Sequence, residues 1–151
     1  MANKELTAGL EDYLEAIYIA KQENKTVKGI NIARMLNISR ASVSEALSKL
    51  VSKGLITYES YGVISFTSVG FSEAEKVYNK HNILKSFFQT VLNISPDEAS
   101  ENACKIEHII SKNVLAEIKD FTCYCNNNPE IISKYRQRKG YNENLSNREI
   151  S

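Results

Sequence analysis

The segment Cys104-Lys105-Ile106-Glu107-His108 places three side chains that bind metal ions at positions i, i+3 and i+4. On a helix these spacings share one face, so the thiol, the carboxylate and the imidazole could converge on one ion. This mixture of ligands suits a transition metal without selecting which one. Taken alone the signal is modest, because a Glu-His pair usually lies on the surface and a single cysteine is usually a small buried residue.

Three further candidate ligands lie far from this segment in the sequence. Asp12 and Glu15 are one helical turn apart, and His81 falls within an apolar stripe. Individually, the two acids are typical of a solvated helix face and the histidine of a core residue with a backbone partner. Together with the first motif they can fill one or two transition-metal sites, with the ligand set Asp12, Glu15, His81, Cys104, Glu107 and His108. No His-Glu-x-x-His pattern is present, which argues against a zinc protease.

The composition is that of a soluble globular protein with one ordinary domain or two small ones that share a core. The 151 residues are 42% hydrophobic and 25% charged, with a formal net charge of +1. So small a charge argues against a general nucleic-acid binder but allows a specific one with a local basic face. No apolar run approaches the ~20 residues of a membrane span, and no signal peptide is evident, so we expect a cytoplasmic protein.

The chain has three cysteines, and Cys123 and Cys125 are too close in sequence to form an easy disulfide. Reduced thiols are therefore expected. The pair could bind a soft metal or take part in redox chemistry, or it could be incidental at a helix end.

The first half of the sequence predicts three helices and a β-hairpin. Apolar periodicity indicates helices over about residues 8–22, 30–36 and 40–52, then strands over 55–59 and 63–67. Asn37 tolerates a left-handed turn, and Ser39 is a natural N-cap for the third helix. Ile38 and Val43 are expected to anchor the turn and the third helix in the core. This order of elements is that of a winged helix-turn-helix.

The third helix would then be the recognition helix of a DNA-binding domain. Its exposed side chains can contact base edges and phosphates in a major groove, while the hairpin reaches the adjacent backbone. The predicted DNA contacts are Ser39, Arg40, Ala41, Ser42, Ser44, Glu45, Lys49 and Tyr61. The alternative is a winged helix that binds protein, which would show no metal-dependent interaction with duplex DNA.

The second half is predicted to be all helical. One long amphipathic helix covers about residues 68–92, and Ser95-Pro96 begins the next helix with an N-cap and a proline at its first position. A third helix includes residues 114–121 and is broken at 126–129. We expect domains over residues 1–70 and 71–138, followed by a polar, flexible tail over 139–151.

Several segments, in order, resemble the diphtheria toxin repressor family of metal-dependent regulators over about residues 6–122. They are 10–18, 32–39 with Ser42-Val43-Ser44, 53–58, 66–70, His81 with Leu84 and Phe87-Phe88, and 103–111. The resemblance implies a winged helix followed by a helical metal-binding and dimerisation domain. It implies a homodimeric repressor of metal-homeostasis genes that binds double-stranded operator DNA and is activated by Mn(II) or Fe(II). Zn, Co or Ni could also bind in vitro, and neither enzymatic activity nor a small organic substrate is implied.

The resemblance matches each of the six candidate ligands by position to a metal ligand of the family. The matches come from two branches of the family, one manganese-responsive and one iron-responsive. Asp12 and Glu15 correspond to ligands of the manganese-responsive branch, whereas Cys104 is the residue of the iron-responsive branch. Lys85 and Ser100 occupy two positions where the iron branch has ligands of an ancillary site, so that site is expected to be degraded. From the length of the chain we expect the two-domain form, without the SH3-like domain of many members.

Alternatives to a metal-activated repressor remain at this point. A regulator that has lost metal control would fit the degraded ancillary site, and a metalloenzyme would need a roomy substrate pocket beside an open metal position. The sequence offers no separate nucleophile or oxyanion motif for such an enzyme.

Overall fold

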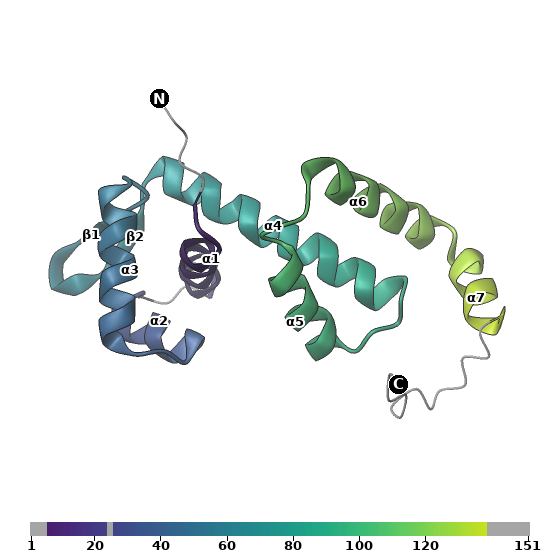
Figure 1. Cartoon of the computed structure of the whole chain (residues 1–151), viewed down its shortest axis with the longest axis horizontal. Helices are drawn as coiled ribbons and strands as arrows, with labels where there is room; N and C mark the ends of the chain where they lie inside the picture. Colours follow the sequence, from purple (N-terminus) through teal and green to yellow (C-terminus); the bar gives the residue numbers. More distant parts are fainter. Residues whose placement is uncertain (1–5, 24–25, 139–151) are drawn as a thin grey trace. The chain divides into compact units, whose positions relative to one another are not determined.

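A computed structural model of the chain describes residues 6–23 and 26–138. It is mainly helical and divides into two compact units, residues 1–81 and 82–151, with the division inside the long helix α4 (Ser68–Thr90) (Figure 1). The predicted flexible tail over 139–151 lies outside the described residues. Within the described ranges, no helix is both long and apolar enough to cross a bilayer.

The first unit begins with three helices, α1 (Ala8–Gln22), α2 (Gly29–Leu36) and α3 (Arg40–Ser52), which contact one another. The α3 helix begins at the predicted cap, because the Ser39 hydroxyl accepts a hydrogen bond from the Ser42 amide at 3.1 Å. Asn37 ends α2 in the left-handed conformation, with φ of 53°. A tight turn therefore joins the two helices, as the sequence predicted for a helix-turn-helix.

A short antiparallel hairpin, the wing, follows α3. Strand β1 (Ile56–Tyr58) pairs with β2 (Ile64–Phe66), and both are shorter than the predicted runs. The connection is a single 3-10 turn, η1 (Ser60–Gly62), in which Tyr61 has a positive φ of 62°. An isolated bridge between Lys28 and Val63 also ties the wing to the segment before α2. Hydrogen bonding thus fixes the base of the wing, while its tip carries Tyr61.

The core of the first unit is built from the inward faces of its helices and strands. Nearly fully buried side chains come from every element, namely Leu14, Ile17, Ile32, Val43, Leu47, Leu50, Ile56, Ile64 and Ala74. Each large one stabilises the fold by roughly 1.5–3 kcal/mol relative to an exposed position. The prediction that Ile38 anchors the turn in this core is wrong, because its side chain is 37% exposed. Val43 fills that role alone.

The second unit contains the C-terminal part of α4 with α5 (Pro96–Ile106), α6 (Lys112–Asn127) and α7 (Pro129–Arg138) (Figure 1). Ser95 caps α5 through the Glu98 amide, as predicted, with Pro96 at the first helical position. The sequence did not predict α7, because the segment from Asn126 to Pro129 indicated only the end of the preceding helix. Proline is unfavourable inside a helix but suits its first position, and Pro129 is the first residue of α7, two residues after the end of α6.

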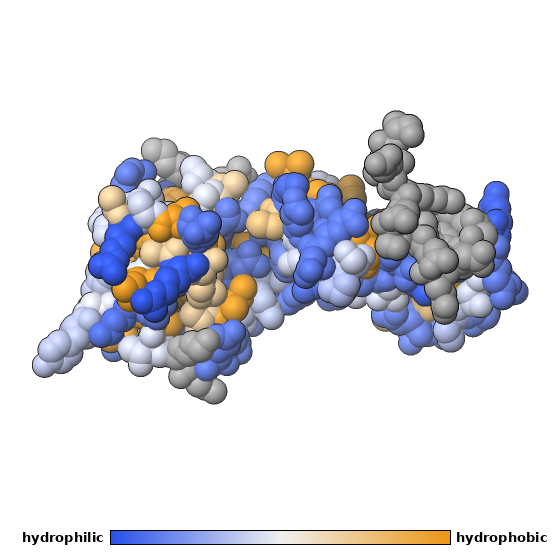
Figure 2. Space-filling model, turned by 90° about the horizontal axis from the view of Figure 1, so that it is seen from below, coloured by the Kyte–Doolittle hydropathy of each residue, from blue (hydrophilic) through white to orange (hydrophobic). Residues whose placement is uncertain are grey.

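Among the described residues, this unit has fewer buried side chains than the first unit, and several of them are small. The buried residues are Leu84, Val91, Ala99, Ala103, Glu107, Thr122 and Cys125. Several large apolar residues are instead exposed, including Ile109, Val114, Phe121 and Tyr124. Figure 2 shows one face of the molecule, where hydrophilic side chains predominate and hydrophobic residues form smaller patches.

Candidate metal centre and nucleic-acid interface

The first unit holds a carboxylate and an imidazole close together and shielded from solvent. Glu15 on α1 and His81 on α4 place Oε1 and Nδ1 3.7 Å apart, with side chains only 10% and 14% exposed. Burying a carboxylate is costly unless another charge, a hydrogen bond or a metal compensates it. Asp12 lies one turn before Glu15 on α1 and is half-buried. Glu15 and His81 form the first candidate donor set.

The second unit holds the motif with which the sequence analysis began. Ligand atoms of Cys104, Glu107 and His108 lie within 4.8 Å of one another, and Glu107 Oε1 lies 3.6 Å from His108 Nε2. The expectation of a helical face is only partly met, because α5 ends at Ile106 and the Glu-His pair follows it in a turn. Glu107 nevertheless keeps helical φ and ψ of −55° and −29°, so the chain continues to curl and the three side chains still converge.

Both donor sets fit a transition-metal ion in chemistry and in spacing. Bonds of about 2.0–2.3 Å from one ion to its ligands place neighbouring donor atoms roughly 3–4 Å apart. The pairs at 3.6 and 3.7 Å are within that range. Oxygen and nitrogen donors suit manganese, iron or zinc, and the thiol of Cys104 draws the preference towards softer ions. The first set offers two protein ligands and the second offers three, so neither alone fills a four- to six-coordinate shell.

The predicted DNA-contacting residues are presented together by α3 and the wing. All seven predicted side chains from residues 39–49 are exposed, and Tyr61 at the wing tip is 93% exposed. Lys49 donates a hydrogen bond of 2.7 Å to Glu45, which holds the pKa of that carboxyl below its usual value. This pair offsets one positive charge, which explains why the face is only mildly basic.

Sequence reasoning missed one hydroxyl on this face and one residue beside it. Ser48 is exposed on α3 between Glu45 and Lys49, and its spacing of four from Ser44 could have indicated it. Tyr13 on α1 lies near both α3 and Asp12, since burial, Glu45 and Asp12 together raise the pKa of its phenol. No sequence pattern pointed to that tyrosine.

Comparison with known proteins matches two family models to consecutive parts of the chain. Residues 5–64 match the iron dependent repressor N-terminal DNA binding domain, and residues 67–135 match the iron dependent repressor metal binding and dimerisation domain. The chain belongs to the diphtheria toxin repressor family. An uncharacterized HTH-type transcriptional regulator of Methanocaldococcus jannaschii is 38% identical over 117 residues, covering 77% of this chain and 94% of the relative.

Two further proteins are similar to this chain at lower sequence identity. The HTH-type transcriptional regulator MntR of Lysinibacillus sphaericus is 26% identical and matches 88% of this chain and 95% of its own. The structure of the manganese regulator SloR superposes with a TM-score of 0.70 at 28% identity, over 79% of this chain. This chain corresponds to about half of that longer protein, 55%.

The family assignment confirms the winged-helix and helical-domain reading of the sequence. The protein is a metal-dependent, DNA-binding transcriptional regulator with a DNA-binding domain and a metal-binding and dimerisation domain. Members of this family are transcriptional regulators rather than enzymes, which agrees with the absence of a nucleophile motif from the sequence. Divalent metal binding is typical of the family.

Proposed function

We propose that this protein is a cytoplasmic, homodimeric repressor of metal-homeostasis genes that binds operator DNA when Mn(II) or Fe(II) is bound. The observation that carries the proposal is the pair of donor clusters, one in the unit with the winged helix and one in the unit with the dimerisation helices. Neither cluster supplies a full coordination shell. The proposed ligands are therefore drawn from both: Asp12, Glu15, His81, Cys104, Glu107 and His108.

The proposed mechanism follows from where these residues are attached. When bound, the ion would neutralise the buried carboxylates and hold ligands from both units. The helix α1 and the turn after α5 would then have less freedom to move apart, and the two recognition helices of a dimer could be kept about 34 Å apart, the spacing of successive major grooves. Metal and operator would bind with positive coupling of typically ~1–3 kcal/mol, or roughly 5–150-fold in affinity.

The choice of manganese or iron rests on the ligands and on named relatives. SloR is described as a manganese regulator, and Asp12 with Glu15 adds hard oxygen donors that suit Mn(II). Cys104 adds a thiol that suits Fe(II) and softer ions. On the DNA side, the proposed contacts are Tyr61 and the exposed residues of α3 named above, through which phosphates would make affinity fall steeply with salt.

The decisive experiment compares operator binding with and without metal. An operator can be selected from random duplex DNA in the presence of Mn(II), and its affinity measured by fluorescence anisotropy with Mn(II), anaerobic Fe(II) or EDTA. We expect at least tenfold tighter binding with metal in the wild type. His108→Ala and the isosteric Glu107→Gln should abolish that gain, whereas Glu117→Gln, at an exposed acid on α6, should keep it.

The alternatives give different results in the same assay. Equal affinity with metal and with EDTA in the wild type would identify a metal-independent regulator. Failure to select any duplex sequence would indicate a winged helix that binds protein.

A further inference from the structure

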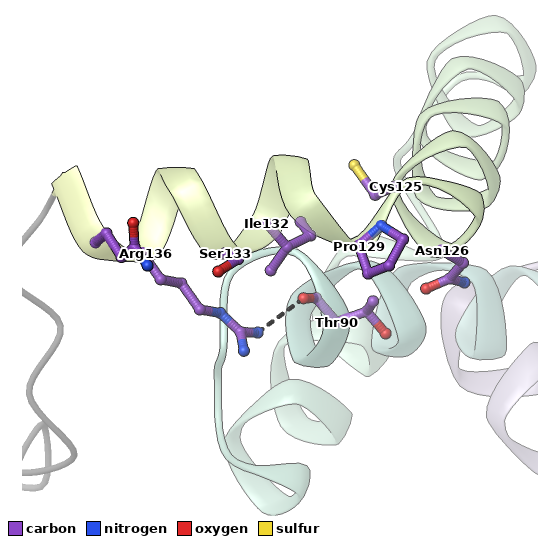
Figure 3. Close-up of a pocket in the computed structure, with 8 residues that line it drawn as sticks. Thr90, Cys125, Asn126, Pro129, Ile132, Ser133 and Arg136 are labelled. Carbon is purple, nitrogen blue, oxygen red and sulfur yellow. Dashed lines mark hydrogen bonds between the residues drawn. The ribbon is translucent and has the colours of Figure 1, made fainter.

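A cavity of about 520 Å³ lies in the second unit, where α7 meets the C-terminal ends of α4 and α6 (Figure 3). It is separate from the proposed metal ligands, none of which lines it. Its wall combines amides, hydroxyls, one guanidinium and a few apolar groups, from Thr90, Cys125, Asn126, Pro129, Ile132, Ser133, Arg136 and Gln137. The volume is within the range of roughly 300–1,000 Å³ that is typical of small-molecule sites.

Arg136 is the only charged residue in this wall, and no acid is among the lining residues. One of its terminal nitrogens, Nη2, donates to the main-chain carbonyl of Thr90 at 2.9 Å, which fixes the side chain across the cavity (Figure 3). Its Nε–H is buried and has no hydrogen-bond partner among the described residues. A buried donor without an acceptor is unfavourable, so stability alone does not explain this placement. An acceptor brought by a ligand would satisfy it.

We propose that this cavity binds a small organic carboxylate as an effector. A guanidinium matches the planar carboxylate with parallel N–H groups, and the positive charge is not offset by any lining acid. Ser133 stands one helical turn before Arg136 and adds a hydroxyl donor. Ile132, Pro129 and the buried Cys125 supply an apolar wall, which suits the hydrocarbon part of a carboxylate better than it suits a fully hydrated phosphate.

The test uses metal-free, full-length protein, so that it does not depend on the proposed metal switch. Sodium benzoate, succinate and inorganic phosphate are titrated at constant ionic strength, and the arginine Nε–H signals are followed by ¹H–¹⁵N NMR. We expect one saturable shift, of the Arg136 signal, with benzoate or succinate, and a weaker or absent shift with phosphate. Arg136→Gln should lose this signal and weaken binding at least tenfold.

Arg138→Gln is the matched control, because it removes the same charge from an exposed position on α7 that does not line the cavity. It should leave the affinity for benzoate unchanged. If Arg136→Gln fails to fold, Ser133→Leu narrows the cavity without removing the charge and should also weaken binding. The proposal is overturned if no carboxylate shifts the Arg136 signal, if phosphate binds at least as tightly, or if Arg138→Gln weakens binding as much as Arg136→Gln.

Discussion

Gly70, in the first turn of α4, is the position where one added methyl group should disturb the DNA-binding unit most directly. A Cβ at this residue would lie 1.7 Å from the carbonyl oxygen of Leu55 and 2.5 Å from its carbonyl carbon. Side chains essentially never approach other atoms within 3.0 Å, so the gap between α4 and Leu55 would have to open from 1.7 Å to at least that distance. The obstacle is backbone at the start of the wing, which cannot rotate away as a side chain could.

The hydrogen bonds around Leu55 set the magnitude. Its carbonyl accepts from the Thr67 amide at 3.1 Å and from the Thr67 hydroxyl at 3.2 Å, while the Gly70 amide donates to that hydroxyl at 3.0 Å. Overpacking of this kind costs about 1–3 kcal/mol, and each weakened hydrogen bond adds about 0.5–1.5 kcal/mol. Alanine recovers only about 0.5–1 kcal/mol of helix propensity. With the middle value of each range and one weakened hydrogen bond, the expected loss for Gly70→Ala is about 2 kcal/mol in the free energy of unfolding, and it is larger if further hydrogen bonds weaken.

Urea unfolding followed by circular dichroism at 222 nm measures this, since the chain has no tryptophan to serve as a fluorescent probe. Gly9→Ala is the matched control, because Gly9 is also helical, on α1, and a Cβ there meets nothing within 4 Å. It should be neutral or stabilising by up to about 1 kcal/mol. A Gly70→Ala protein as stable as the wild type would refute the argument that the wing base and α4 need this close approach.

Three further predictions concern a cap, the second core and a buried thiol. Ser39→Ala removes the oxygen that accepts a hydrogen bond from the Ser42 amide, and it should lower the free energy of unfolding in urea by about 1 kcal/mol. Ser44→Ala is the control, because Ser44 lies within α3 and does not cap it. Leu84→Ala, at a side chain only 1% exposed, should cost about 2–5 kcal/mol by the same measurement; a loss below 1 kcal/mol would mean that this core closes around the gap. Burial raises the pKa of the Cys125 thiol above its ordinary value of 9.0, so its contribution is complete below pH 9 and is lost as the pH rises through the folded pKa. Wild type should therefore lose stability relative to Cys125→Ala as the pH rises above 9, and the exposed Cys123 should react with iodoacetamide before Cys125 does.

Local sequence signals predicted those parts of the fold in which a residue type is compatible with only one local structure. The bounds of α1 and α3 followed from apolar periodicity and from Ser39 as a cap. The helix α7 was not predicted because a proline can mark the end of one helix or the first residue of the next, and the sequence analysis considered only the end. Ile38 was misplaced because an apolar residue in a tight turn can face either way, and only the packing of the whole unit decides between them.

The sequence predicted the donor set of the second unit but not the distances within that of the first. Spacing alone put Cys104, Glu107 and His108 together, since residues three and four apart stay close in any helical curl. Sequence spacing could not predict that His81 lies close to Glu15, because 65 residues separate them. Only tertiary packing brings His81 Nδ1 to 3.7 Å from Glu15 Oε1. Residue chemistry grouped these two residues with the other candidate ligands, and the family resemblance then matched each of them to a metal ligand, but neither gave their distance.

The end of α5 at Ile106 bears on how the second donor set can work. A ligand inside a regular helix is held by helical hydrogen bonds on both sides, whereas Glu107 and His108 lie in a turn. In this turn the Glu107 amide donates to the Ala103 carbonyl, and the amides of residues 109 and 110 donate to the Ile106 carbonyl. Turns of this kind open at lower free energy than helix interiors. Cys104 stays on the helix while its two partners can adjust, so the set can accept ions of different radius without unfolding α5. On this argument, selectivity between Mn(II) and Fe(II) would come from the nature of the proposed donors, above all the Cys104 thiol against the carboxylates of Asp12 and Glu15, rather than from a rigid cage of fixed size.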